Sequence, residues 1–409
     1  MQKQRRLIIA YFFIQGIAHN IGHPVTPAFV RSLLIPDHMF GVFFASMSLG
    51  MMIGGPIWGI LSDRGHKRNY IFLGLILYSL GQFAFGYFHH QTAMIFFRFI
   101  SGIGAAAGAT LLISHLIETT EPHQRAYSLA FAAAATTLGA SLGYYIGGFI
   151  STNTWMVDVL KVNTYPKVFL TQALVNGLYA LFLFFTFKET PQEATEKPKE
   201  TFISHLKDIT KIDKSLLIFL ISLTLITIGA TNLSKYVDVY FDELGYTPQD
   251  LGTFVFVTGI VSVFASLFIV PIFTRFKNQI KTIAVIQLFS AAIVLYVFRA
   301  SNFLLVIYTV YMIYIVFKAV YLPLEQNYIS SHATEGKYGK VIGIRQAFLA
   351  IGMVLGPLIG GFIYERSALL LFDTSAYIFI LGVLLLGLVR YFDKKKKTES
   401  ILNDSQSEQ

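Results

Sequence analysis

GASLGYYIGGFI at residues 139–150 and GMVLGPLIGGFI at residues 352–363 are two copies of one pattern. Eight of the twelve positions are identical, and the second copy follows the first at an offset of 213 residues. Glycines four residues apart let two helix backbones approach closely. We therefore predict a duplicated helical fold with packing contacts at a shared set of positions: Gly139, Gly143, Gly147, Gly148, Gly352, Gly356, Pro357, Gly360 and Gly361.

The chain around this repeat is too apolar for a soluble protein. It has 409 residues, of which 54% are hydrophobic and 13% charged, whereas soluble domains have about 25% charged residues. A membrane-spanning helix needs about 20 mostly apolar residues. Twelve segments fit: 7–30, 39–62, 70–88, 92–117, 126–150, 168–187, 215–239, 251–273, 279–298, 303–327, 341–364 and 374–388.

These segments predict an all-α membrane protein with twelve transmembrane helices in two pseudo-symmetric six-helix bundles. Residues 1–187 form the N-terminal bundle and residues 215–392 the C-terminal bundle, joined by a polar linker at 188–214. Residues 393–409 are Lys-rich and then polar, and we expect a disordered tail. The basic start of the chain leads into an apolar run with no small-residue cleavage site, so we interpret it as a retained first span.

The positive charges predict the orientation. With the N-terminus in the cytoplasm, 24 of the 32 Lys and Arg residues fall in inside segments, five fall in outside segments and three lie within spans. Basic residues collect on the cytoplasmic side of membrane proteins. Both termini are therefore expected in the cytoplasm, and the net charge of +9 needs no nucleic-acid partner.

Ionisable residues within the spans are costly and usually face an internal cavity. They lie in the first, fourth, seventh and tenth spans, together with polar residues spaced by three or four along one helix face. These stripes predict a substrate and proton cavity lined by Gln15, His19, His23, Arg98, Thr231, Lys235, Asp238, Tyr311, Tyr314, Lys318, Tyr321 and Glu325.

Each stripe also has a simpler interpretation. Lys235 and Asp238 can neutralise one another, and the tyrosines can pack as ordinary interior. His19 and His23 can carry protons near neutral pH or serve helix packing. The histidines have metal-ligand spacing but no third ligand is evident, and the chain has no cysteine, so we expect no metal site.

Three further motifs carry a family resemblance. They are GILSDRGHKR at residues 59–68, RFISGIGAA at 98–106 and HPVTP at 23–27. Together with the glycine repeat they resemble signature motifs of the major facilitator superfamily, and especially of its twelve-helix drug:proton antiporters. The chain departs from the family pattern in having His66 at a usual glycine, Ser101 at a usual glutamine and Tyr144 at a usual proline.

The resemblance implies that the first, fourth, seventh and tenth helices line a central cavity. It also implies a cytoplasmic gate, in which Asp63 faces the start of the eleventh helix and the neighbouring cations pair with carboxylates such as Glu118. The gate residues are Gly59, Asp63, Arg64, Lys67 and Arg68. Alternatively, this loop is only a basic segment on the cytoplasmic side, with no role in gating.

The predicted function is secondary active transport of a small or amphipathic solute by alternating access, with protons as the coupling ion. Export of drug-like molecules is favoured by the antiporter motifs. Transport or flipping of an anionic metabolite or lipid-linked substrate is favoured by the cations Arg98, Lys235 and Lys318. No catalytic or phosphate-loop motif is evident, so we expect neither an enzyme nor a cofactor. The expected form is a monomer in a bacterial inner or plasma membrane.

Overall fold

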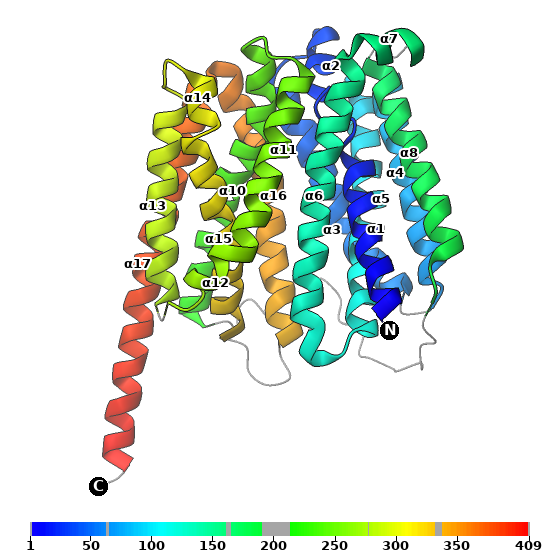
Figure 1. Cartoon of the computed structure of the whole chain (residues 1–409). Coiled ribbons are helices and arrows are strands. Elements are labelled where there is room, and N and C mark those ends of the chain that lie inside the picture. The colour runs from blue at the N-terminus through cyan, green and yellow to red at the C-terminus, as the bar shows by residue number, and fades with distance from the viewer. Residues whose placement is uncertain are drawn as a thin grey trace. The chain divides into compact units, whose positions relative to one another are not determined.

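The structure is a computed structural model that describes residues 2–62, 65–160, 165–189, 213–276, 278–331 and 338–407. Every element within these ranges is a helix (Figure 1). In chain order they are α1 Gln2–Asn20, α2 Thr26–Ser32, α3 His38–Ser62, α4 Lys67–Tyr87, α5 Gln91–Thr119, η1 Pro122–Gln124, α6 Arg125–Thr152, α7 Thr154–Leu160, α8 Tyr165–Thr186, α10 Lys214–Glu243, α11 Pro248–Phe264, η3 Ala265–Ile269, α12 Val270–Phe273, α13 Gln279–Val297, α14 Phe303–Ile307, α15 Val310–Ser331, α16 Tyr338–Arg366 and α17 Ala368–Ser407.

Eleven helical segments in the described ranges are long and apolar enough to cross a membrane. They coincide with the second to twelfth predicted spans, with ends shifted by a few residues. The prediction of a helical membrane protein is confirmed at this level. The count of twelve and the cytoplasmic position of both termini stay predictions.

The first predicted span, residues 7–30, is not one continuous helix. It breaks between α1 and α2 at residues 21–25. Pro24 and Pro27 have no backbone N–H to donate, and the connection is made by turn bonds, from His23 N–H to Asn20 O (3.2 Å) and from Thr26 N–H to His23 O (3.1 Å). The break places His23 in a turn rather than on a helix face.

Two other segments depart from straight helices. Residues Ala265–Ile269 form a π turn just before Pro271, which has no backbone N–H and whose ring crowds the carbonyl four residues earlier in the chain. At the C-terminus, α17 continues to Ser407, where the sequence predicted a disordered tail from residue 393. Residues 388–407 contain neither proline nor glycine, the two residues that most disfavour a helix.

Contacts group the chain into two compact units. The first comprises Met1–Lys197, Ser234–Phe264 and Pro357–Ala368, and the second comprises Pro198–Leu233, Ala265–Gly356 and Leu369–Gln409. Helices α10 and α16 therefore each contribute residues to both units. Most of the predicted linker, residues 190–212, lies outside the described residues, and the predicted bundle boundaries remain predictions.

In the first unit, α6 packs between α1 and α11, and α5 packs against α3 and α4 (Figure 1). The contact between α1 and α6 depends on the glycine pattern. A methyl group added at these glycines would collide with carbonyl oxygens of α1: Gly139 with Phe13, Gly143 with Ile17, and Gly147 with Ile21. Only glycine allows this approach.

The second unit repeats this arrangement with the second copy of the pattern. A methyl group at Gly352 would lie 2.9 Å from the carbonyl oxygen of Thr224, and one at Gly356 would lie 3.1 Å from that of Ile228. Both carbonyls belong to α10, the first helix after the predicted linker. The repeated sequence thus marks the same helix contact in each half of the chain.

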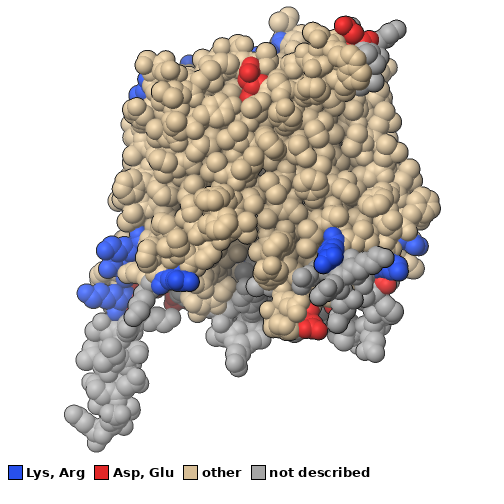
Figure 2. All heavy atoms as spheres, viewed as in Figure 1, with Lys and Arg blue, Asp and Glu red and all other residues tan. Residues whose placement is uncertain are grey.

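The surface is apolar over the length of the helices. On the face drawn in Figure 2, the coloured Lys, Arg, Asp and Glu side chains of the described residues lie near the helix ends, and a broad band between them is tan. Large side chains on α8, such as Leu174 (60% exposed) and Leu178 (66% exposed), point outward. This distribution is what a lipid environment requires.

Candidate functional site

A cluster of buried ionisable side chains lies within the first unit. Arg98, on α5, is only 2% exposed. Its Nη1 donates to Gln82 Oε1 at 3.3 Å, and its guanidinium carbon lies 3.7 Å from the centre of the Phe85 ring. Its Nε has no hydrogen-bond partner. Among the described residues, no carboxylate oxygen lies within ion-pair distance of this guanidinium.

The C-terminal part of α10 adds one carboxylate and one ammonium group to this cluster. Asp238 is 4% exposed, and its Oδ2 accepts a hydrogen bond of 2.9 Å from the Tyr144 hydroxyl on α6. Lys235 Nζ lies 4.9 Å from the centre of the Phe44 ring on α3. No ion pair within 4.0 Å joins Lys235 to Asp238 in the described part of the chain. The expected mutual neutralisation is therefore not a direct salt bridge.

The two histidines stack on tyrosines of this cluster. His19 stacks on Tyr78 with 4.0 Å between ring centres, and His23 stacks on Tyr144 at 5.5 Å. The backbone oxygen of His19 accepts hydrogen bonds from Tyr78 Oη and Gln172 Nε2, each 2.6 Å long. His23 is close enough to Arg98 and Lys235 for their charges to act on it. The stacking serves packing and keeps both imidazoles inside the unit.

Several buried polar atoms around this cluster have no hydrogen-bond partner. Buried polar groups are usually paired, so a concentration of unpaired ones needs an explanation. Gln15, whose amide lies against Gly108, is one of them. The atoms are Gln15 Oε1, His19 Nε2, Gln82 Nε2, Arg98 Nε and Gln172 Oε1. They come from α1, α4, α5 and α8.

The other predicted cavity residues belong to the second unit. Tyr311 and Tyr314 on α15 are buried, with 5.1 Å between their ring centres, and the Tyr314 hydroxyl has no hydrogen-bond partner. The Thr231 hydroxyl donates to the carbonyl of Thr227 at 2.6 Å. Lys318 and Tyr321 follow on the same helix, α15. The predicted cavity set is thus divided between the units, six residues in each.

Glu325 pairs with a cation that sequence reasoning missed. Arg345 Nε lies 3.0 Å from both carboxylate oxygens of Glu325, and Arg345 Nη2 also contacts Oε1. The side chains are 0% and 4% exposed, respectively. Arg345 falls within the predicted span 341–364. That position inside an apolar segment was the available signal.

Part of the predicted gate motif is described. The ammonium group of Lys67 contacts Glu118, as predicted, and lies 3.4 Å from Ser114 Oγ. The Arg68 N–H donates to Glu189 Oε1 at 2.8 Å. A side chain at Gly59 would meet no atom within 4 Å, so packing does not require this glycine. Asp63 and Arg64 lie outside the described residues.

A second charged cluster lies at the opposite end of α3 and was not predicted. Arg31 binds Asp37 through two hydrogen bonds of 3.1 and 3.2 Å and binds Asp242 at 3.1 Å. Burial opposes the charge on Arg31, but the hydrogen bond and charge of Asp37 outweigh it and raise the pKa of Arg31. His38 Nδ1 lies 3.0 Å from Glu365 Oε2. These contacts fasten the ends of α10 and α16 to the α2–α3 connection.

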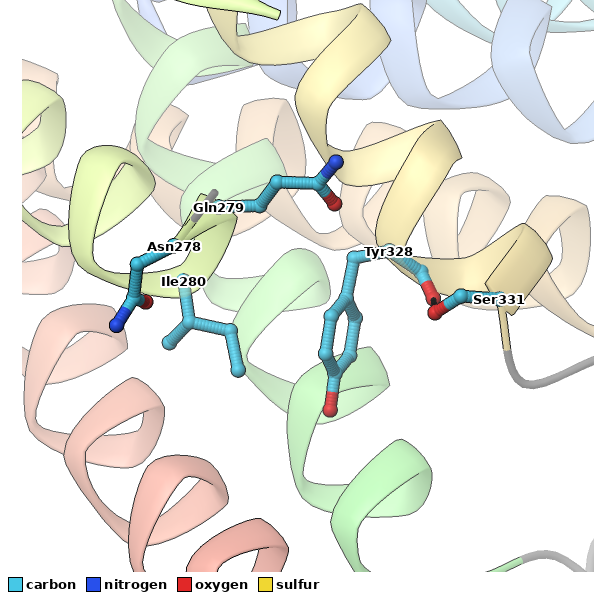
Figure 3. A pocket seen from close by; sticks show the side chains of 5 residues that line it. All are labelled: Asn278, Gln279, Ile280, Tyr328 and Ser331. Atoms are coloured by element: carbon cyan, nitrogen blue, oxygen red, sulfur yellow. Dashed lines mark hydrogen bonds between the residues drawn. The ribbon is translucent and has the colours of Figure 1, made fainter. Parts of the chain in front are cut away.

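One pocket in the second unit contains none of the predicted residues. It has a volume of about 490 Å³ and lies between the start of α13 and the end of α15 (Figure 3). Asn278, Gln279 and Ile280 line one side, and Tyr328 and Ser331 line the other. The Tyr328 hydroxyl also donates a hydrogen bond of 3.1 Å to Asp393 Oδ2 on α17, so this helix contacts one of the residues that line the pocket.

The family of the chain follows from comparison with known proteins. A model of the Major Facilitator Superfamily matches residues 7–315 and, in a second match, 242–408. The chain is 23% identical to Multidrug resistance protein 2 of Bacillus subtilis (strain 168), covering 97% of both proteins. It is 25% identical to Quinolone resistance protein NorA of Staphylococcus aureus (strain MSSA476), covering 88% of this chain and 90% of NorA.

Solved structures agree at the level of the fold. A bacterial homolog to the human lysosomal transporter Spinster, in an inward-facing and occupied conformation, matches with a TM-score of 0.78 at 13% identity, covering 95% of this chain and 96% of that one. A D-xylose–proton symporter matches with a TM-score of 0.72 at 15% identity, covering 94% and 96%. With its apolar helices, this chain is a multi-pass membrane transporter rather than an enzyme, and it belongs to the Major Facilitator Superfamily.

Proposed function

We propose that the chain is a proton-coupled exporter of amphipathic, drug-like solutes. It would work by alternating access, with twelve spans, both termini in the cytoplasm and the broken α1–α2 segment as the first span. The observation that carries this proposal is the buried cluster of Arg98, Lys235 and Asp238. Ionisable groups at membrane depth mark ion and substrate pathways, and the aromatic rings beside them can hold an apolar body.

The relatives support the direction of transport. The names of the Bacillus and Staphylococcus proteins refer to multidrug and quinolone resistance, which efflux would produce. At 23% and 25% identity this supports export by the present chain without assigning its substrate. The proposed coupling residue is Asp238, which is the one buried carboxylate in the described part of the cluster.

The proposed gate lies where α3 ends, α4 begins with Lys67, and α5 ends. The contacts of Lys67 with Glu118 and Ser114 join α4 to α5. The Glu118 side chain is 35% exposed, so one partner of this ion pair is accessible to water, which suits a contact that breaks and reforms during transport. The role of Asp63 and Arg64 in this gate stays a proposal from the family motif.

The test is transport by purified protein in liposomes with an imposed pH gradient. We expect a lipophilic fluorescent dye to move against its concentration gradient only when protons can flow the opposite way. Asp238→Asn should abolish this coupling, and Lys281→Gln, which removes an exposed cation on α13, should preserve it. Gradient-independent equilibration by the wild type would contradict the proposal.

Transport of an anionic metabolite or lipid-linked substrate is the second candidate. It is favoured by the excess of cations, since Arg98 and Lys235 share one described carboxylate, Asp238. The same liposomes distinguish the two candidates by direction. An anion importer would accumulate its substrate together with protons, whereas the proposed exporter exchanges substrate for protons.

A further inference from the structure

The charges buried in the first unit form no direct ion pair among the described residues. Arg98 is bound by a neutral amide and an aromatic ring, and Lys235 lies on an aromatic ring. Asp238 accepts a hydrogen bond from a neutral hydroxyl. All three are fixed by uncharged partners, although buried charges are normally paired with opposite charges. A bound ligand could therefore place a negative group on the two cations and a positive group on Asp238.

We propose that this cluster is a binding subsite for amphipathic zwitterions, in which Arg98 and Lys235 bind the carboxylate and Asp238 binds the protonated amine. The inference rests on the proposed transport function and specifies its substrate class. A guanidinium presents several N–H donors in a plane that suits a carboxylate. The unpaired Nε of Arg98 is one such donor.

The polar atoms without partners support a ligand at this place. Arg98 Nε and Gln82 Nε2 are both hydrogen-bond donors. Arg98 and Gln82 are at least 98% buried. Gln82 on α4 is the direct hydrogen-bond partner of Arg98 on α5, so both unpaired donors lie at the guanidinium. The carboxylate of a zwitterion would accept hydrogen bonds from these donors, whereas a purely apolar molecule would leave them unpaired.

Aromatic side chains around the charges suit an amphipathic body. Phe44 and Phe85 lie directly against Lys235 and Arg98. Tyr144 reaches Asp238 with its hydroxyl and His23 with its ring. A cation–π contact lowers the free-energy cost of burying a cation but does not neutralise its charge. Lys235 and Arg98 therefore keep their charge available for a ligand.

A zwitterion also explains how binding could oppose protonation. The ammonium group of the substrate and a proton would compete for Asp238, which is faced by Tyr144 from α6, Lys235 on its own helix, and the charges of Arg98 on α5 and His23 in the α1–α2 turn. Two ligands that compete for one group exclude one another, and this coupling is reciprocal. A simple anion would instead bind better when Asp238 is protonated.

Three matched fluorescent probes test the subsite on the purified full-length protein. Nε-dansyl-lysine is the zwitterion, its methyl ester is the cation, and its Nα-acetyl derivative is the anion. We expect the wild type to bind the zwitterion at least about tenfold more tightly than either analogue, measured by dansyl fluorescence. Arg98→Gln and Lys235→Gln should lower zwitterion affinity to that of the ester, and Asp238→Asn should lower it to that of the acetyl derivative. Losing one partner of a buried charge pair typically lowers affinity roughly 30-fold or more.

The control variant is Lys281→Gln, which removes a cation outside the cluster and should bind all three probes as the wild type does. Lys235→Gln keeps the test valid if Arg98→Gln does not fold, because the described contact of Lys235 is one aromatic ring. Gel-filtration profiles identify folded variants. Equal affinity of the wild type for the three probes would overturn the subsite. So would an equal loss for all three probes in folded Arg98→Gln, Lys235→Gln and Asp238→Asn.

The two proposals fail separately. If the dye is not exported under a pH gradient, the transport proposal is wrong, whatever the probes show. If the dye is exported while the wild type binds the three probes equally, the transport proposal stands and the zwitterion subsite is wrong.

Discussion

Replacing Arg345 alone should destabilise the second unit more than replacing both members of its ion pair. Arg345 and Glu325 are 4% and 0% exposed, and Arg345 Nε is 3.0 Å from both carboxylate oxygens. Arg345→Met leaves the Glu325 carboxylate buried without a counter-charge. Removing one partner of such a pair costs about 3–5 kcal/mol. For a unit of this size, that corresponds to a fall of roughly 6–20 °C in the unfolding midpoint.

The double variant Glu325→Leu/Arg345→Met removes both charges. Replacing a buried ion pair with apolar side chains is often neutral or stabilising, so we expect it to unfold within a few degrees of the wild type. The assay is the fraction of monodisperse detergent-solubilised protein that remains after heating, because membrane proteins often unfold irreversibly. The control is Arg299→Gln, which breaks an ion pair with Asp373 at a 48% exposed arginine and should cost less than about 1 kcal/mol. If Arg345→Met were as stable as the double variant, the Glu325 carboxylate would not depend on Arg345 for its counter-charge, and the reasoning would be wrong.

Four further predictions follow from single contacts. Gly147→Leu should prevent stable folding, because its Cβ would collide with the Ile21 carbonyl. At Gly177 an added Cβ meets no atom within 4 Å, so the control Gly177→Leu should yield normal amounts of monodisperse protein. His66→Gly should raise thermal stability by about 1 kcal/mol, because His66 has φ 61° and a left-handed backbone is costly for residues with a side chain; an unchanged midpoint would contradict this. Lys67→Met should change transport rate more than thermal stability if its contact with Glu118 opens during transport; an equal loss of stability would argue for a purely structural role. Single cysteines placed at residues 2 and 405 of this cysteine-free chain should react with an impermeant thiol reagent only in inside-out vesicles, and labelling in right-side-out vesicles would contradict the predicted topology.

The helices were predictable from sequence because their signal is strong and local. A run of about 20 apolar residues has few alternatives to a transmembrane helix, and eleven predicted spans coincide with described helices. The glycine repeat also predicted a contact, since Gly139 and Gly352 both mark a close approach to the first helix of their half. The break at Pro24 and the π turn before Pro271 were missed, because hydropathy does not register where a backbone N–H is absent.

The side-chain partners were less predictable. Spacing placed Lys235 and Asp238 on one helix face, but it could not show that Asp238 binds Tyr144 rather than Lys235. The sequence showed that Tyr144 replaces the proline usual in the family. The structure shows that the Tyr144 hydroxyl donates a hydrogen bond to Asp238. The cluster around Arg31 was missed because Asp242 lies 211 residues from Arg31 and Glu365 lies 327 residues from His38, and no local pattern connects positions so far apart.

The most direct test of the central claim is the reactivity of single cysteines with a small, charged, water-soluble thiol reagent. The claim is that the predicted cavity residues of the first unit face a water-accessible substrate path, whereas the outward side chains of α8 face lipid. Cysteines at Gln15, His23 and Lys235 should react and should be protected by a transported substrate, whereas cysteines at Leu174 and Leu178 should stay unreactive. Reaction at Leu174 and Leu178, with no reaction at Gln15, His23 and Lys235, would contradict the account.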